Sequence, residues 1–271
     1  MNLTLLPSPF SLDQCRQGMG RAPEALLAAG LVAALESDGH TVRVAERSTE
    51  LGDGDRLTRL GRNLGLLAEA SAEARHAGTL PVILGGDCLV SIGAVAGLRH
   101  SLAEDFGIVW FDAHGDFNTP ETTISGYLGG MPLACCCGRG LEELRAAAHL
   151  TQPVSDANVA LLGVRDLDPA ECALLDSTPV RRFEPAHVAG FAPQVLPTYL
   201  HFDIDALDTR FAPGVNYPAP NGLTPQAALE AARKVRPHLA ALSLTAVDPE
   251  LDPNGQTVRM GVELLRGILR E

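Results

Sequence analysis

The sequence predicts an α/β protein in which a central parallel sheet is covered by helices on both faces. Short apolar runs alternate along the chain with stretches of helix length. A strand that is buried on both faces needs helices above and below it, and this gives three layers, α/β/α. Proline- and glycine-rich stretches at 190–197 and 212–222 fall between neighbouring elements. They are typical of loops, so we expect one domain over residues 1–271.

The strand and helix patterns follow one another in order. Residues 80–84 (LPVIL) and 107–111 (GIVWF) are continuous apolar runs, whereas 41–45 alternates between polar and apolar side chains. The predicted strands are residues 1–7, 41–45, 80–84, 107–111, 159–164, 199–204 and 240–247. The predicted helices are residues 22–37, 55–77, 89–100, 139–149, 168–176, 224–236 and 257–270, with ends defined to about 2–4 residues.

Composition excludes several classes of function. The chain has 33 acidic and 21 basic residues and a net charge of −12, which disfavours nucleic-acid binding because phosphate contacts need Lys and Arg. No apolar stretch approaches the roughly 20 residues that span a bilayer, and the first residues lack the basic lead of a signal peptide. Three of the six cysteines are consecutive, Cys135 to Cys137, which is no disulfide spacing. We therefore expect a reduced, cytoplasmic protein that does not associate with membranes.

Polar side chains gather where three predicted strands end. They are Asp87 and Cys88 after 80–84, Asp112, His114 and Asp116 after 107–111, and Asp203, Asp205 and Asp208 in or after 199–204. In an open parallel sheet the carboxyl ends of strands share one edge, where ligands bind. Carboxylates crowded there repel one another and raise one another's pKa values, a conflict that divalent cations resolve.

Either acidic segment alone is as typical of a solvated turn or a helix cap as of a metal site. Both occur here behind buried strands, and residues two apart on an extended segment share a face. Asp112, His114 and Asp116 can thus converge, as can Asp203 and Asp205. The mixture of His and Asp favours a first-row metal, so we interpret the edge as a metal centre.

The three motifs resemble those of the arginase superfamily, which includes arginases, agmatinases and formimidoylglutamases. The matching segments are GGDCLVSIG (85–93), FDAHGDFNTPET (111–122) and FDIDALD (202–208). The resemblance implies an arginase-like fold and two divalent cations, Mn²⁺ foremost. One cation would be held by Cys88, Asp112, Asp116 and Asp203, and the other by Asp112, His114, Asp203 and Asp205. It also implies a catalytic role for Asp116, which would take a proton from the attacking water and deliver it to the departing nitrogen.

Cys88 departs from the family pattern, because most members have His there. A thiolate shifts metal preference towards Zn²⁺, Fe²⁺ or Co²⁺. The alternative is a buried thiol that leaves one site weak or empty. Some relatives with Cys at this position hydrolyse N-hydroxylated arginine, which favours ligation.

Two further departures concern the substrate. Gly129 stands where arginases have a proton-shuttling His, so protons must come from elsewhere or the leaving group needs less help. Ala246 stands where they have a Glu that pairs with the guanidinium. Either Asp248 or Glu250 substitutes for that Glu after a local shift, or the substrate is not a plain guanidinium.

Several positions that bind an α-amino acid in arginases are retained. Asn118, Thr123 and Ser125 match positions that bind the α-carboxylate, and Asp168 matches one that binds the α-amino group. Tyr127 replaces a carboxylate-contacting Asn. Asp168 precedes a proline, so a helix N-cap is an equal alternative for its role.

Other residues carry weaker signals. His201 shares a strand face with Asp203 and Asp205, which suits either a support for the metal centre or a core histidine. The remaining histidines carry no motif, and the cysteine run at 135–137 is typical of small apolar packing.

The leading hypothesis is a binuclear metal-dependent hydrolase of a guanidino or amidino C–N bond, acting on arginine or N-hydroxyarginine and releasing urea or a urea analogue. A formimino- or ureido-compound hydrolase is the first alternative. A non-catalytic metal-binding relative is the second, favoured by the three departures and disfavoured by five retained Asp and His ligands. The resemblance also implies a homo-oligomer.

Overall fold

Eight parallel strands form the centre of the molecule in the computed structural model, which describes residues 1–45, 49 and 51–270. Their order across the sheet is β4-β1-β5-β10-β9-β6-β7-β8. The strands are β1 (Asn2–Ser8), β4 (Thr41–Val44), β5 (Leu80–Gly85), β6 (Gly107–Phe111), β7 (Val159–Leu162), β8 (Arg181–Phe183), β9 (Thr198–Asp203) and β10 (Leu239–Thr245). A short antiparallel pair, β2 (Phe10–Ser11) and β3 (Gln14–Cys15), lies apart from this sheet.

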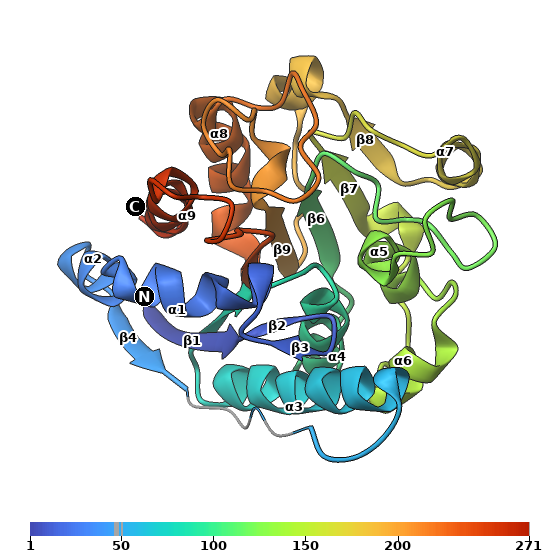
Figure 1. The fold of residues 1–271 in the computed structure, drawn as a ribbon, viewed down its shortest axis with the longest axis horizontal. Coiled ribbons are helices and arrows are strands. Elements are labelled where there is room, and N and C mark those ends of the chain that lie inside the picture. The colour runs from blue at the N-terminus through green and yellow to red at the C-terminus, as the bar shows by residue number, and fades with distance from the viewer. Residues whose placement is uncertain (46–48, 50, 271) are drawn as a thin grey trace.

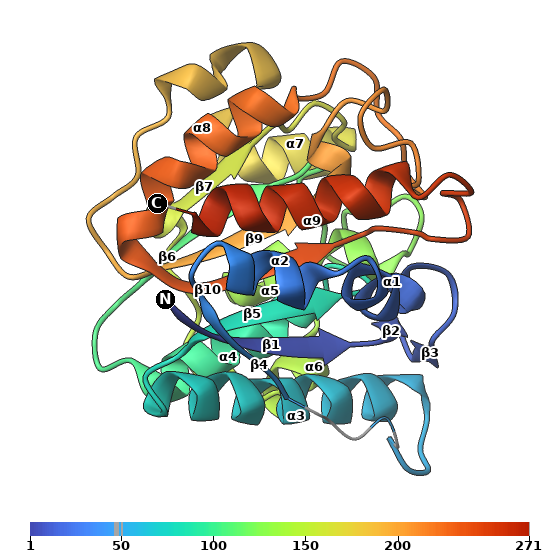
Figure 2. The same ribbon diagram turned by 90° about the vertical axis from the view of Figure 1, so that its left-hand side faces the viewer.

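Helices cover both faces of the sheet, as Figures 1 and 2 show. One face is covered by α1 (Ala22–Ala28), α2 (Leu31–Ser37), α8 (Pro225–Val235) and α9 (Gln256–Leu269). The other is covered by α3 (Arg56–His76), α4 (Val90–Ser101), α5 (Pro132–Cys136) and α6 (Glu142–Ala147). The helix α7 (Pro169–Asp176) lies beside β8. This arrangement confirms the predicted three-layer α/β/α fold.

The sheet divides the core into two layers because successive side chains of a strand point to opposite faces. Val82 and Leu84 of β5 pack with the α8 and α9 side, whereas Ile83 packs with the α3 and α4 side. The same alternation separates Phe111 from Trp110 on β6. The central strands are buried on both faces, which explains why their sequences read as continuous apolar runs.

Most of the predicted elements are confirmed, but the short elements β2, β3 and α5 were not predicted and three further differences are informative. The predicted helix at 22–37 is two helices, because Gly30 adopts a left-handed conformation (φ 87°) between α1 and α2. The strand β8 was missed, since it has three residues, two of them arginines, and lies at the sheet edge. The helix expected at 139–149 is shorter, Glu142–Ala147.

The strand order opens a crevice at the carboxyl edge. The neighbouring strands β9 and β6 continue in opposite directions across the sheet, because the chain passes from β9 back to β10 and from β6 on to β7. Such a switch point is where open α/β sheets bind ligands. The three motif-bearing strands, β5, β9 and β6, all end at this crevice.

Candidate metal centre

The acidic segments are locked to one another by backbone hydrogen bonds. Asp203 accepts a hydrogen bond from the Asp205 amide at 2.8 Å, which shapes the turn after β9. Asp205 in turn accepts one from the Ala113 amide at 3.1 Å, so it ties this turn to the segment after β6. Asp112 accepts one from the His114 amide at 2.7 Å. These contacts hold the side chains in place before any ligand is present.

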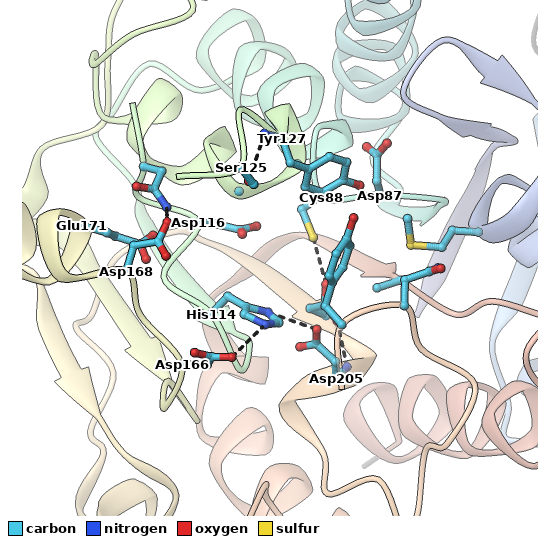
Figure 3. A pocket seen from close by; sticks show the side chains of 18 residues that line it. Asp87, Cys88, His114, Asp116, Ser125, Tyr127, Asp166, Asp168, Glu171 and Asp205 are labelled. Atoms are coloured by element: carbon cyan, nitrogen blue, oxygen red, sulfur yellow. Dashed lines mark hydrogen bonds and ion pairs between the residues drawn. The ribbon is translucent and has the colours of Figure 1, made fainter. Parts of the chain in front are cut away.

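Two groups of donor atoms result, each with its atoms within 4.8 Å of one another. The first comprises Cys88, Asp112, His201 and Asp203, and the second comprises Asp112, His114 and Asp205. The Cys88 thiol donates to Asp203 at 3.0 Å. His114 Nδ1 lies 3.2 Å from both Asp112 Oδ1 and Asp205 Oδ2, and Figure 3 shows His114 beside Asp205. Asp112 belongs to both groups, as a bridging ligand would.

The shifted pKa values of this cluster show that its ionised carboxylates are disfavoured when no cation is bound. Burial and the neighbouring carboxylates raise the pKa of Asp203 well above its usual range, and burial raises that of Asp112 to about 6. Burial alone would lower the pKa of His114, but hydrogen bonds to Asp112 and Asp205 raise it to about 12. Burial also raises the pKa of the Cys88 thiol. A dication would remove this repulsion and favour the ionised ligands.

Asp116 provides an independent test of whether the residues fit a metal. Its Oδ2 is buried and has no hydrogen-bond partner within the described part of the chain. Its backbone is left-handed (φ 47°), a conformation that is uncommon for non-glycine residues. An orphaned buried carboxylate is costly, and a cation would satisfy it. Asp116 lines the same pocket as Cys88, although neither donor group includes it.

A pocket of about 310 Å³ opens over the two groups, large enough for an amino acid. Among the residues matched to α-amino-acid binding, Asn118, Ser125 and Asp168 line it. Thr123 does not, although its hydroxyl lies 3.5 Å from that of Ser125 and accepts from the Gly126 amide. Asp168 holds the N-cap position of α7 without capping it, and its carboxylate accepts from Asn118 at 3.1 Å. The side chain therefore lines the pocket and does not cap the helix.

The glycine at position 129 does not leave an open space in the pocket wall, because the Tyr127 side chain fills it. A Cβ at Gly129 would lie 2.2 Å from the Tyr127 ring, so the phenol occupies the space that a side chain at 129 would need. The Tyr127 ring lies 5.3 Å from that of Tyr217. Figure 3 shows Tyr127 beside Cys88 and Asp87. The replacement of a side chain at 129 by one at 127 was not foreseen from the sequence.

Neither of the two carboxylates considered from the sequence takes the place of the missing Glu at Ala246. Asp248 is buried and accepts from Asn216 at 2.8 Å, and Glu250 pairs with Arg21 at 3.3 Å. Neither lines the pocket, so the local shift considered from the sequence does not occur.

Sequence reasoning also missed residues that support the site. Glu171 accepts from the Phe117 amide at 2.8 Å, and a Cβ on Gly115 would lie 2.6 Å from it. Gly115 in the motif therefore allows a buried glutamate to hold the Asp116 turn. A Cβ on Gly86 would lie 2.1 Å from the Phe10 carbonyl oxygen, which explains the second glycine of the GGDC segment. The glycines could be read from the motifs, but their partners could not.

Arg165 is the main support of the Asp205 turn. Its guanidinium donates to the carbonyl oxygens of Asp205 at 2.8 Å, Ala219 at 2.9 Å, Pro220 at 2.9 Å and Gly163 at 3.0 Å. One side chain thus joins the turn after β9 to the loop at 212–222 and to the end of β7.

We expect Arg165→Lys to destabilise the protein, because an ammonium cannot span four carbonyls in different directions. Each carbonyl left without a donor costs about 1 kcal/mol, so the free energy of unfolding should fall by roughly 2–3 kcal/mol. Urea denaturation followed by circular dichroism measures this. A loss below about 0.5 kcal/mol would show that water replaces the guanidinium without cost.

A parallel α/β/α sheet with paired acidic donor groups at its carboxyl edge is the architecture of the ureohydrolase class. The "Arginase family" model matches residues 1–270. An arginase of Bacillus caldovelox is 31% identical over 300 residues, which cover 99% of this chain and 98% of the relative. The human protein "Arginase-2, mitochondrial" is 32% identical and covers 92% of this chain and 78% of its own length. The crystal structure of arginase from Bacillus subtilis, 27% identical, superposes with a TM-score of 0.87 and covers 100% of this chain and 99% of that one.

The chain belongs to the arginase family and is a hydrolase that acts on C–N bonds. The resemblance drawn from the three motifs is thereby confirmed. Membership of a subgroup with a Cys ligand, which Cys88 indicates, stays a prediction. Over residues 1–45, 49 and 51–270, no helix combines the length and apolar character that crossing a bilayer requires.

Proposed function

We propose that this protein hydrolyses the guanidino C–N bond of an arginine derivative, N-hydroxyarginine before arginine, at a pair of divalent cations. The proposed ligands are Cys88, Asp112, Asp116 and Asp203 for one cation and Asp112, His114, Asp203 and Asp205 for the other. Bound cations would supply a nucleophile at neutral pH by lowering the pKa of water. Mn²⁺ is the family's expected metal, and Cys88 admits Zn²⁺, Fe²⁺ or Co²⁺.

The residues around the cluster have distinct proposed roles. Asp116, whose buried Oδ2 lacks a partner among the described residues, accepts a proton and passes it to the leaving nitrogen. Asp168 binds the α-amino group of the substrate, and Asn118, Ser125 and Thr123 bind its carboxylate, Thr123 through its neighbour Ser125. Holding both ends of the amino acid fixes where its guanidino carbon lies.

The single observation that favours a hydroxylated substrate is the pocket wall formed by Ala246 and Tyr127. A protonated guanidinium needs a facing carboxylate, and position 246 offers a methyl group. An N-hydroxyguanidine is less basic, because the oxygen withdraws electron density, and its hydroxyl is suited to a phenol partner. Tyr127 presents such a phenol in the pocket.

A product assay tests this proposal with the metal-loaded enzyme. We expect kcat/KM for hydroxyurea release from N-hydroxyarginine to exceed that for urea release from arginine by about tenfold or more, which is roughly 1.4 kcal/mol. Equal or greater turnover of arginine would overturn the substrate preference. Turnover of a formimino compound alone would favour the alternative hydrolase.

Tyr127→Phe tests the phenol, since it keeps the ring that fills the space at Gly129. The hydroxyguanidine loses one hydrogen bond worth about 1 kcal/mol, so its kcat/KM should fall about fivefold while that for arginine stays within a factor of two. Steady-state kinetics on both substrates give the ratio. A parallel loss on both would mean that the hydroxyl serves a part that the two substrates share, and no loss on either would mean that it does not contact the hydroxyguanidine.

We further propose that residues 1–271 act as a single domain, in the cytoplasm, as a homo-oligomer without nucleic-acid or membrane partners. The continuous sheet supports the first point and the acidic composition supports the exclusion of nucleic acid. Size-exclusion chromatography with light scattering tests the oligomeric state, and a monomeric mass would contradict it.

A further inference from the structure

His201 is an unexpected member of the donor group around Cys88. It lies on β9 two residues before Asp203, so both side chains share a face of the sheet. One of its ring nitrogens is among atoms from Cys88, Asp112 and Asp203 that all lie within 4.8 Å of one another. Its side chain is fully buried, so no solvent competes for that nitrogen.

The two ring nitrogens of His201 have different surroundings. Nδ1 lies 2.8 Å from the Ser243 hydroxyl and 2.9 Å from that of Ser91. Among the described residues, Nε2 has one longer contact, 3.3 Å to the Thr245 hydroxyl, which itself lies 3.5 Å from Cys88 Sγ. Nδ1 is therefore held by hydroxyls, and Nε2 lies beside the Thr245 hydroxyl that also contacts Cys88. A histidine that binds a metal has this pattern, because the nitrogen away from the metal is held by a hydrogen-bond partner.

The ring plane is also fixed. The indole of Trp110 stacks on the imidazole at 3.7 Å between centroids and 23° between planes. The same indole donates through Nε1 to Asp112 at 2.9 Å. Trp110 thus orients two members of the group at once, and this rigidity is what a preorganised metal ligand requires.

We propose that His201 is a ligand of the cation held by Cys88, Asp112 and Asp203. This proposal rests on the metal centre proposed above and adds a ligand from the body of a strand to those from the motifs. With Cys88, His201 and the carboxylates of Asp112, Asp116 and Asp203, this set has a sulfur ligand and is softer than the set of Asp112, His114, Asp203 and Asp205. The two sites are then unequal, with the Cys88 side preferring Zn²⁺ or Co²⁺ over Mn²⁺.

X-ray absorption spectroscopy of the Zn²⁺-loaded protein tests this directly, because it detects imidazole bound to the metal. The informative variant is His114→Asn, which removes the other imidazole of the centre. We expect imidazole scattering to persist in His114→Asn and to vanish when His201→Asn is added. Its disappearance already in His114→Asn overturns the proposal, and this outcome requires no His201 variant to fold.

Ser243→Ala is the matched control, since it removes one hydroxyl from Nδ1 and leaves the imidazole in place. Combined with His114→Asn, it should keep the imidazole scattering. In the Co²⁺-loaded protein, His201→Asn should shift the thiolate-to-cobalt absorption of Cys88, and an unchanged band would count against ligation. If the parent protein releases hydroxyurea but His114→Asn shows no imidazole scattering, only the inference about His201 is overturned. If the protein binds no metal, the proposed function is overturned as well.

Discussion

Asp205→Ala is expected to lose one of the two cations and nearly all activity. Among the described donor groups the carboxylate belongs only to the one around His114, so removing it leaves that cation with Asp112, His114 and Asp203 of its proposed ligands. Losing one cation removes several kcal/mol of transition-state stabilisation, so kcat/KM should fall by at least about a thousandfold. Elemental analysis of the dialysed protein and the hydroxyurea assay measure the two effects.

Two further variants separate charge from structure. Asp205→Asn can still accept the hydrogen bond from the Ala113 amide, so it should fold normally and yet lose the metal. Asp176→Ala removes an exposed carboxylate that pairs with Arg182, and it should keep both metal and activity. Full activity of Asp205→Ala would refute the second cation site.

Asp116→Asn is expected to abolish turnover while the protein still folds. The amide has nearly the shape of the carboxylate and lacks its capacity to accept a proton, so kcat should fall by about 10²–10⁴. Asn also tolerates the left-handed backbone at this position (φ 47°) better than most residues. Single-turnover kinetics on N-hydroxyarginine measure the chemical step.

The thermal unfolding midpoint of Asp116→Asn with bound metal serves as its control and should match that of the parent protein. If kcat falls less than about fivefold with both cations bound, proton transfer does not pass through Asp116. If one cation is lost instead, Asp116 acts mainly as a ligand.

The fold could be predicted because the sequence pattern and the burial agree. Strands β5 and β6 are buried on both faces, and their apolar runs stop where the polar motifs begin. Because the carboxyl ends of parallel strands share one edge, the ends of these runs also predicted that Asp112, Asp203 and Cys88 lie together. The break at Gly30 escaped prediction, because its neighbours favour helix and a single glycine in a helical pattern is tolerated.

The parts of the site that escaped prediction depend on contacts between distant segments. Arg165 reaches carbonyls that lie 40 or more residues away, and no local pattern encodes that reach. Tyr127 fills the space beside Gly129 because of the turn between them. His201 was left open between two roles, since the sheet register places Ser243 beside it and the packing of α4 places Ser91 there, and neither can be read from the local sequence.

Anomalous diffraction from crystals soaked in Mn²⁺ tests most directly whether the clustered side chains at the carboxyl edge hold a pair of ions. Two peaks about 3.5–4 Å apart are expected, one near Cys88 and Asp203 and one near His114 and Asp205, with Asp112 between them. A pocket filled only by water, with these side chains turned away from one another, would contradict the account.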